Sequence, residues 1–199
     1  KIGDTICVLD GIGNCYEVKL EKKGKDFVEG KILSRRENFR EPKLHLTLVV
    51  GLLKNFAKFD FIVEKATELG VKKIIPMISE HTISQSAKVE RWRQLALTAM
   101  KQCGRGFLPI VSDQKSFDEI IPSKENEGKK NICYEYEEHN SKLQIEHCKF
   151  AIVVVGSEGG FSESEIGKAK ENNFELLSLG ERRLRTETAA IVACSKFLL

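Results

Sequence analysis

A glycine-rich turn follows the most apolar strand-like segment of the chain, residues 150–155. The turn is Gly156–Gly160, and Ser162 with Glu165 three positions later forms a capping-box pattern that predicts the start of a helix. A strand, a glycine turn and a helix N-terminus together form a ligand site at the carboxyl edge of a sheet. These residues therefore predict such a site, although a plain strand-to-helix turn is the alternative.

The composition of this turn argues against a phosphate ligand. Neither G-x-x-x-x-G-K-[ST] nor G-x-G-x-x-G occurs in it, and the turn contains no lysine. Glu158 would place a carboxylate where a phosphate needs hydrogen-bond donors. A nucleotide-phosphate enzyme is therefore disfavoured, and a ligand with hydroxyls, a positive charge or a flat ring fits better.

A second unusual stretch, Leu179–Ala190, also follows an expected strand and opens an expected helix. Thr186 is a suitable N-cap, and Glu187 would lie in the first turn, where the helix dipole favours an acid. Arg185 does not fit this account, because a cation beside a helix N-terminus is electrostatically disfavoured. Two such turns at the ends of neighbouring strands predict one shared pocket.

Alternating strands and helices are predicted to carry these turns. Gly70 is the expected C-cap of the first helix. The alternation indicates an α/β fold with a mainly parallel sheet covered on both faces. The expected strands are 44–50, 73–78, 150–155 and 175–179, and the expected helices are 57–69, 89–102, 163–173 and a C-terminal helix from about Glu187.

The beginning of the chain has a different pattern. Short strands are expected at 5–9, 15–20 and 27–33, separated by glycine-containing turns. The polar stretch 35–43 has no periodicity and is the best linker candidate. We therefore expect a small β domain over residues 1–43 and an α/β domain over 44–199.

Composition and charge exclude several classes of protein. The chain has 199 residues, of which 41% are hydrophobic and 31% charged, which is an ordinary globular balance. No apolar stretch approaches the roughly 20 residues of a membrane span, and no signal peptide is visible, so no membrane association is expected.

The net charge of the chain is +3. Residues 1–100 carry 18 Lys and Arg against 13 Asp and Glu, which is compatible with a nucleic-acid partner without proving one.

The cysteines and histidines indicate neither a disulfide framework nor a metal site. The six cysteines are scattered without a C-x-x-C pair, and the four histidines lie at no metal-ligand spacing. This pattern is typical of a reducing compartment, so we expect a cytoplasmic protein with no metal.

The two turns lie within longer motifs that resemble the RsmE family of the SPOUT methyltransferases. The motifs are VVGSEGGFSESEI (Val154–Ile166) and SLGERRLRTETAAIVA (Ser178–Ala193), in the order and at the separation of that family. KFDFIVEKATELGV (Lys58–Val71) and WRQLALTAMKQCGRGFLP (Trp92–Pro109) are similar to further family blocks. The resemblance covers essentially the whole chain.

This resemblance implies an S-adenosylmethionine-dependent methyltransferase that modifies N3 of a uridine in 16S RNA of the small ribosomal subunit. It also implies a PUA-like RNA-binding β-barrel that begins before Lys1, a SPOUT-type parallel sheet tied in a trefoil knot, and a homodimer. The dimer interface is expected to include Ala190, Ile191 and Cys194 of the C-terminal helix. The implied cofactor-binding residues are Val155, Gly156, Glu158, Gly159, Gly160, Leu179, Gly180, Leu184, Arg185, Thr186, Thr188 and Ala189.

The chemistry implied by the resemblance assigns roles to a few polar residues. Uracil N3 must lose a proton before it attacks a methyl group, which requires a base and a cation near the developing charge. We expect Arg185 to be the cation, and Glu187 or Glu158 to be the proton acceptor. Expected RNA contacts are Arg105, Lys54, Arg35 and Arg36.

Four alternatives remain open at this point. Arg105 could be a solvent-facing residue after a helix C-cap, and Lys54, Lys65 and Glu68 could merely pair on a helix face. The protein could also be a SPOUT ribose 2'-O-methyltransferase, which shares the cofactor pocket. Finally, it could be a non-catalytic RNA-binding or ribosome-assembly protein that binds no cofactor.

Overall fold

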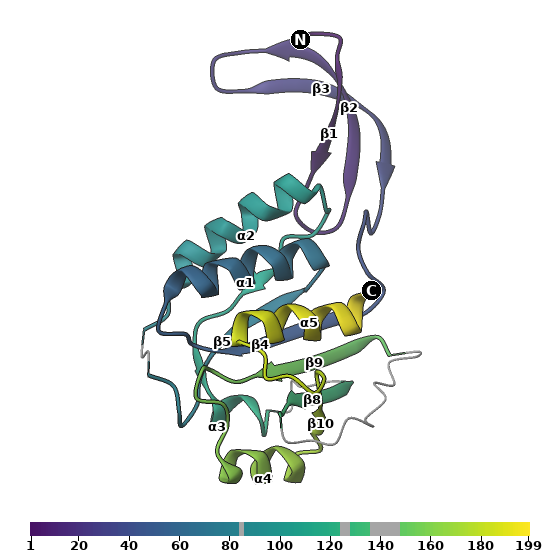
Figure 1. Ribbon diagram of the computed structural model, residues 1–199. Helices are drawn as coiled ribbons and strands as arrows, with labels where there is room; N and C mark the ends of the chain where they lie inside the picture. The colour runs from purple at the N-terminus through teal and green to yellow at the C-terminus, as the bar shows by residue number, and fades with distance from the viewer. Residues whose placement is uncertain (84–85, 124–127, 136–147) are drawn as a thin grey trace.

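Two β-sheets make up the framework of the molecule (Figure 1). The computed structural model describes residues 1–83, 86–123, 128–135 and 148–199. A three-stranded sheet contains β1, β2 and β3, and a seven-stranded sheet is covered by helices on both faces (Figure 1). The elements are β1 Thr5–Leu9, β2 Cys15–Lys23, β3 Val28–Arg36, β4 His45–Gly51, α1 Phe56–Leu69, β5 Lys73–Ile78, α2 Val89–Cys103, β6 Ile110–Val111, β7 Lys115–Ser116, α3 Phe117–Ile120, β8 Lys129–Cys133, β9 Phe150–Val155, α4 Glu163–Glu171, β10 Glu175–Leu177 and α5 Thr186–Leu198.

The N-terminal sheet is antiparallel, with β2 between β1 and β3. The β1–β2 turn is organised by Asp10, whose Oδ1 accepts hydrogen bonds from the backbone N–H groups of Ile12 and Asn14 at 2.9 and 3.0 Å. Across this hairpin Cys7 and Cys15 form a disulfide. The cysteine spacing predicted no disulfide, and that prediction is wrong here because hairpin pairing brings together two cysteines whose spacing matches no known motif.

The seven-stranded sheet has the order β10-β8-β9-β4-β5-β6, with β7 also paired to β5, and every pair is parallel. Because all strands run the same way, the turns after β9 and β10 emerge at one edge of the sheet. The segments before β4 and β5 lie at the opposite edge. Everything predicted to bind the cofactor therefore belongs to the carboxyl edge.

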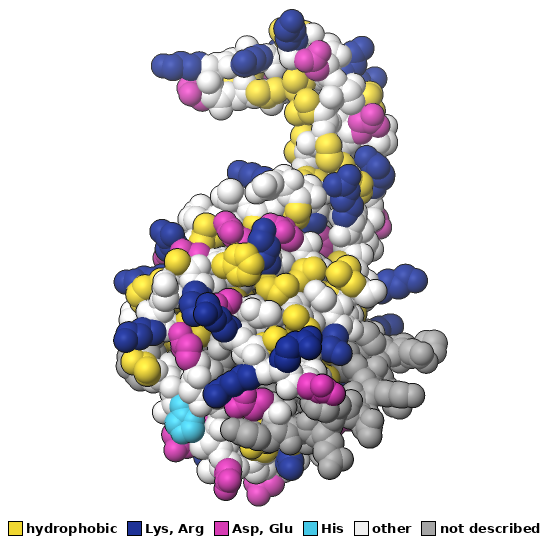
Figure 2. Space-filling view, in the orientation of Figure 1, with side chains coloured by type: hydrophobic (Ala, Val, Ile, Leu, Met, Phe, Trp, Pro, Cys, Tyr) yellow, Lys and Arg dark blue, Asp and Glu magenta, His cyan; other side chains and the backbone are white. Residues whose placement is uncertain are grey.

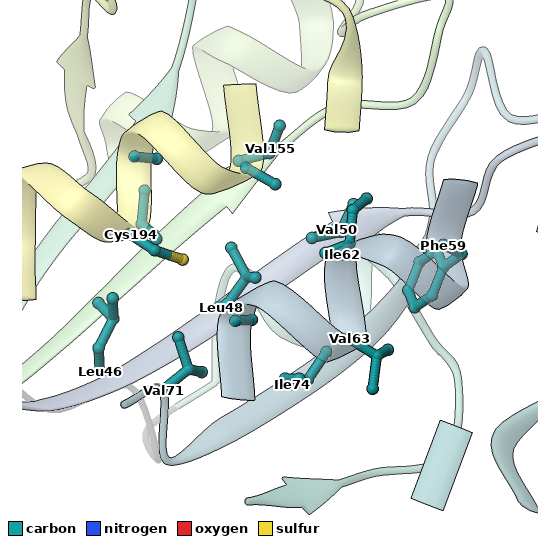
Figure 3. Close-up of a cluster of buried hydrophobic side chains, with 14 of the residues drawn as sticks. Leu46, Leu48, Val50, Phe59, Ile62, Val63, Val71, Ile74, Val155 and Cys194 are labelled. Carbon is teal, nitrogen blue, oxygen red and sulfur yellow. The ribbon is translucent and has the colours of Figure 1, made fainter. Parts of the chain in front are cut away.

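The core lies on both faces of this sheet because successive strand residues point to opposite sides. Leu48 and Val50 of β4 pack toward α1 and α5, whereas Val49 between them packs against the residues of α3 and α4. Figure 3 shows the first of these clusters, with Phe59 and Ile62 of α1 facing the strands. Burying each such side chain stabilises the folded state by about 1.5–3 kcal/mol.

Local signals fix the ends of the first long helix, α1. Asn55 caps it, because its side-chain oxygen accepts a hydrogen bond from the Ala57 N–H at 2.9 Å. It ends at Gly70, whose φ of 103° is accessible mainly to glycine, as predicted for a C-cap. The predicted helix and its C-cap are thus confirmed, with the start one residue earlier than expected.

Other expectations differ in detail from the structure. The predicted strand 175–179 ends at Leu177, and the predicted helix 163–173 ends at Glu171. The short elements β6, β7, α3 and β8 were not predicted, because two to five residues carry too little periodicity. Among the described residues, no helix is both long and apolar enough to cross a membrane.

Candidate functional site

The glycine turn after β9 is packed tightly against the end of β4. Gly160 donates a backbone hydrogen bond to the Ser157 carbonyl at 3.0 Å, which closes the turn. A Cβ on Gly51 would lie 2.3 Å from the Ser157 nitrogen, so only glycine allows this approach. No heavy atom lies within 4 Å of a Cβ built on Gly160, so the turn is open on that side.

A neighbouring loop holds the glycine turn from the side. His81 Nδ1 lies 3.0 Å from the Gly159 carbonyl oxygen, and the Ser157 hydroxyl donates to the His81 carbonyl at 3.3 Å. The predicted capping box of Ser162 and Glu165 is present at the start of α4. Glu165 also accepts the Glu80 N–H at 2.9 Å, which ties the same loop to α4.

The second turn begins after β10 and leads into α5. Gly180 has a φ of 120°, which strains any other residue, and open space surrounds the position of its missing Cβ. The N-cap of α5 is Arg185, without a side-chain cap, so the N-cap predicted at Thr186 is wrong. The first backbone N–H groups of α5 therefore have no capping side chain and face the region where a ligand would lie.

The two turns line one cavity of about 950 Å³. Of the residues predicted to bind a cofactor, only Thr188 is absent from its wall, because that side chain lies on an exposed part of α5. The predicted residues that line it are Val155, Gly156, Glu158, Gly159, Gly160, Leu179, Gly180, Leu184, Arg185, Thr186 and Ala189.

Several lining residues were not predicted. Lys58 from α1, His81 from the loop after β5, and Tyr134 after β8 reach the cavity from elements distant in sequence. Cys133 also lines it, and burial raises the pKa of its thiol to about 12, so the thiol stays neutral. Lys58 begins the block Lys58–Val71 but was assigned no role there, and no local motif marks His81, Cys133 or Tyr134. The order of the strands brings these residues to the same edge of the sheet.

Charged side chains in the cavity differ in how far they are already paired. Glu187 Oε1 lies 3.4 Å from Lys58 Nζ, and the buried Oε2 has no partner among the described residues. Arg183 pairs with Glu135 at 3.1 Å. Within the described part of the chain, the Arg185 guanidinium is exposed and forms no ion pair or side-chain hydrogen bond. Arg185 is thus a cation available to a ligand.

The carboxylate of Glu158 is the more accessible acid of the cavity. Its residue is exposed, and Oε1 accepts the backbone N–H of Lys54 at 3.3 Å. This contact places Lys54, another exposed residue, next to the cavity mouth. Glu158 and Glu187 therefore both belong to the site, but Glu158 is exposed whereas the Glu187 side chain is only 16% exposed and its Oε2 is buried.

Arg105 has a structural role in place of the predicted RNA contact. Its side chain is only 3% exposed, and Nη1 donates to the carbonyls of Thr67 and Val71 at 2.8 and 3.0 Å. Its Nη2 lies 2.7 Å from Glu41. Because its donors are consumed inside the fold, both the RNA-binding and the solvent-facing interpretations of Arg105 are corrected.

The other predicted RNA contacts lie on the surface. Arg35 and Arg36 end β3, and both are exposed. Lys65 and Glu68 pair on the surface of α1 at 2.8 Å, as the alternative interpretation proposed. Figure 2 shows Lys and Arg side chains distributed over the N-terminal sheet. No group of three or more His, Cys, Asp or Glu side chains suitable for a metal occurs in the described ranges.

A parallel α/β sheet with a glycine-lined cavity at its carboxyl edge is the arrangement of a nucleotide-cofactor enzyme. The chain belongs to the RNA methyltransferase family, because the model of the RNA methyltransferase domain matches residues 40–198. Within that family it belongs with the ribosomal RNA small subunit methyltransferase E proteins.

Relatives from distant bacteria support this membership. The methyltransferase E of Buchnera aphidicola is 30% identical over 199 residues, covering 97% of this chain and 78% of the relative. That of Aquifex aeolicus is 32% identical over 185 residues, covering 90% and 79%. The crystal structure of the Neisseria gonorrhoeae methyltransferase E, bound to S-adenosyl methionine, matches with a TM-score of 0.81 and 31% identity, covering 98% of this chain and 82% of that one.

Proposed function

We propose that the protein transfers a methyl group from S-adenosylmethionine to N3 of a uridine in the RNA of the small ribosomal subunit. The observation that carries this proposal is the shared cavity, in which two glycine turns and the start of α5 surround Arg185, an arginine without an ion pair to any described residue. The relatives named for small-subunit ribosomal RNA, and the one solved with S-adenosyl methionine, support it.

The residues of the cavity fit this cofactor. Gly160 and Gly180 leave open space beside the backbone, which suits a flat base and a ribose. Leu179, Leu184 and Ala189 supply apolar contact, and the uncapped start of α5 supplies N–H donors for a carboxylate. When bound, S-adenosylmethionine supplies an electrophilic methyl group on a sulfonium.

Side chains of the cavity orient the uracil, stabilise its negative charge and accept its proton. Arg185 orients the uracil and stabilises the negative charge that appears when N3 loses its proton. Glu158 accepts that proton, because its carboxylate reaches solvent whereas Glu187 is held by Lys58 with its other oxygen buried. Glu187 remains the second candidate. Lys54, Arg35 and Arg36 contact the RNA.

The larger architecture belongs to the same proposal. We assign residues 1–43 to an RNA-binding, PUA-like β domain and 44–199 to a SPOUT methyltransferase domain with a trefoil knot. The separate antiparallel sheet and the family match from residue 40 support the division. The return of α5 to pack on α1 and β4, elements far earlier in the chain, supports a knotted crossing. Action on ribosomal RNA supports a cytoplasmic location.

A homodimer is also proposed, with a corrected interface. Ala190 and Cys194 are fully buried in the chain's own core, so they cannot face a partner. Ile191 and Val192 of α5 are half-buried, and Phe61 of α1 is 43% exposed, which leaves an apolar surface for a second copy. Light scattering at micromolar concentration tests this, and a monomer would contradict it.

Label transfer tests the activity. The purified protein is incubated with methyl-labelled S-adenosylmethionine and small ribosomal subunits, and calorimetry measures cofactor binding in parallel. Label recovered as 3-methyluridine supports the proposal, whereas label on a ribose oxygen indicates the 2'-O-methyltransferase. Failure to bind the cofactor indicates a non-catalytic RNA-binding protein.

A further inference from the structure

Glu158 occupies one of the two central positions of a tight turn. The Gly160 N–H donates to the Ser157 carbonyl at 3.0 Å, so residues 157–160 form a β-turn with Glu158 and Gly159 between its ends. Both central residues are exposed. An exposed turn closed by one backbone hydrogen bond belongs to the parts of a protein that open most easily. A carboxylate that must meet one atom of a substrate therefore needs support from outside the turn.

His81 supplies this support on both sides of Glu158. The hydroxyl of Ser157, the residue before Glu158, donates to the His81 carbonyl at 3.3 Å. The carbonyl oxygen of Gly159, the residue after Glu158, lies 3.0 Å from His81 Nδ1. The backbone and the side chain of one residue thus hold both neighbours of the residue that carries the carboxylate. We call these two hydrogen bonds the His81 clamp.

The partner of the imidazole defines its hydrogen-bonding state. A carbonyl oxygen can only accept, so Nδ1 must carry the hydrogen and act as the donor. A neutral imidazole then has its lone pair on Nε2, and an imidazolium keeps the same Nδ1–H. The clamp therefore persists in both protonation states of His81, and its effect on the turn does not require the ring to change its charge.

The glycine at position 159 allows the loop after β5 to reach the turn. A Cβ on Gly159 would lie 2.6 Å from the His81 Cβ and 3.0 Å from the His81 carbonyl oxygen. A larger residue at this position would push the turn away from the loop and break the clamp. Close approach to His81 is therefore one reason why residue 159 is glycine.

The loop that carries His81 is itself held in place. The Ser79 N–H donates to Thr82 Oγ1 at 3.0 Å, and the Thr82 N–H donates to the Ser79 carbonyl at 3.0 Å. The Glu80 N–H donates to Glu165 Oε1 at 2.9 Å, at the start of α4. Ser79, Thr82 and Glu165 are buried. The loop therefore presents His81 to the glycine turn in a fixed position.

The Glu158 side chain has a support of its own. Oε1 accepts the Lys54 N–H at 3.3 Å, from the segment that follows β4. Because β9, β4 and β5 are neighbours in the sheet, the segments after three adjacent strands meet at this carboxylate. Within the described part of the chain, Oε2 forms no hydrogen bond, so it is the oxygen that is available to a substrate.

We propose that His81 is a positioning residue that holds the Glu158 carboxylate where it accepts a proton from the substrate. This inference rests on the proposed function, in which Glu158 is the proton acceptor. A general base must lie within hydrogen-bond distance of the proton that it removes, and a displacement of about 1 Å costs up to about 10²-fold in rate. The close contact between Gly51 and the Ser157 backbone remains without the clamp, so losing the clamp affects the base more than the cavity wall.

Hydrogen exchange in the cofactor-free protein tests the clamp itself. NMR follows the Gly160 amide, which closes the turn, in wild type, His81→Ala, His81→Asn and the control His45→Ala. Asn carries a side-chain N–H that can replace Nδ1–H, and His45 is an exposed histidine that begins β4 at the opposite edge of the sheet. We expect about tenfold faster exchange in His81→Ala alone, as for one lost hydrogen bond. Equal exchange in all four proteins would overturn the clamp.

Methylation kinetics test what the clamp positions. His81→Ala should lower kcat by about tenfold to a hundredfold, while KM for RNA and the affinity for S-adenosylmethionine stay within a small factor of wild type. His81→Asn should recover most of the lost turnover, and His45→Ala should lose none. A fall in cofactor affinity as large as the fall in kcat would assign His81 to the cofactor pocket and overturn the positioning role.

A double-mutant cycle shows whether His81 acts through Glu158. Adding His81→Ala to Glu158→Gln should cost almost no further turnover in single-turnover experiments, because the base that the clamp positions is already absent. The same loss in both backgrounds would overturn the inference. Normal turnover of both wild type and His81→Ala would contradict the positioning role alone, whereas a wild-type protein that transfers no methyl group to small subunits would contradict the proposed function.

Discussion

Lys58 Nζ on α1 lies 3.4 Å from Glu187 Oε1 in the first turn of α5. The Glu187 side chain is 16% exposed, and the helix N-terminus adds its own attraction for the carboxylate. This pair joins two elements that lie far apart in sequence and closes one wall of the cavity. Glu187 is therefore held in place before any ligand arrives.

The first prediction compares the two carboxylates. Glu158→Gln should lower turnover by about 10²–10⁴, the range of general-base contributions, while cofactor affinity stays within a small factor. Glu187→Gln should cost less turnover, because its carboxylate is already paired with Lys58. Steady-state methylation of small subunits checks both variants, and a larger loss for Glu187→Gln would reassign the proton acceptor to Glu187.

The second prediction concerns Arg185. Arg185→Ala should bind S-adenosylmethionine nearly as well as wild type but lose roughly a hundredfold or more in turnover, because its partner is charge that develops during the reaction. Arg182→Ala removes another exposed cation that lines the same cavity and is the matched control. If the only defect of Arg185→Ala were lost cofactor affinity, the residue would belong to the binding pocket.

The third prediction concerns the turn before α5. Gly180→Ala should weaken cofactor binding, because a φ of 120° costs a non-glycine residue on the order of 1–3 kcal/mol and the turn would relax. Gly167→Ala, in open space on α4, should bind normally. Calorimetry measures both, and normal binding by a folded Gly180→Ala would remove this turn from the cofactor site. Gly159 is a poorer target, since a Cβ there would lie 2.6 Å from His81.

The fourth prediction concerns pH and the buried carboxylate of Glu41. Burial raises its pKa, but hydrogen bonds from Arg105 and Lys72 outweigh burial and lower the pKa below its usual value of 4.5. A depressed carboxyl pKa stabilises the fold above the unfolded pKa, and this contribution disappears as pH falls through the folded pKa.

Denaturant unfolding at several pH values checks this linkage. At pH 7 Glu41→Gln should be less stable than wild type by about 3–5 kcal/mol, because it leaves Arg105 buried without its partner. As the pH falls below 4.5 and through the lowered pKa of Glu41, the difference should shrink because the wild-type carboxylate protonates. If the difference in unfolding free energy between wild type and Glu41→Gln stayed constant from pH 7 into the acid range, the stability would not depend on the ionisation of Glu41, which would contradict this prediction.

The local motifs predicted much of the fold and the cavity. The capping box at Ser162, the C-cap at Gly70 and the apolar β9 were read from neighbouring residues, because caps and periodicity are local properties. The two glycine turns meet because parallel strands end at the same edge of the sheet. The alternation of strands and helices in the sequence predicted that the sheet is parallel, and therefore predicted this meeting as well.

What the sequence did not predict depends on contacts across the sheet. Lys58 follows β4 and His81 follows β5, and both reach the cavity because β4 lies between β9 and β5 in the sheet, an order that no local pattern specifies. Arg105 was assigned to RNA because its buried partner Glu41 comes much earlier, in a segment interpreted as a linker. The Cys7–Cys15 pairing likewise depends on the register of the hairpin.

Nucleoside mass spectrometry of small-subunit ribosomal RNA, from cells with and without this protein, tests the central claim most directly. We predict that 3-methyluridine disappears in the deletion strain, returns with the wild-type gene and does not return with Arg185→Ala. Unchanged 3-methyluridine in the deletion strain, or loss of a ribose-methylated nucleoside in its place, would contradict the account.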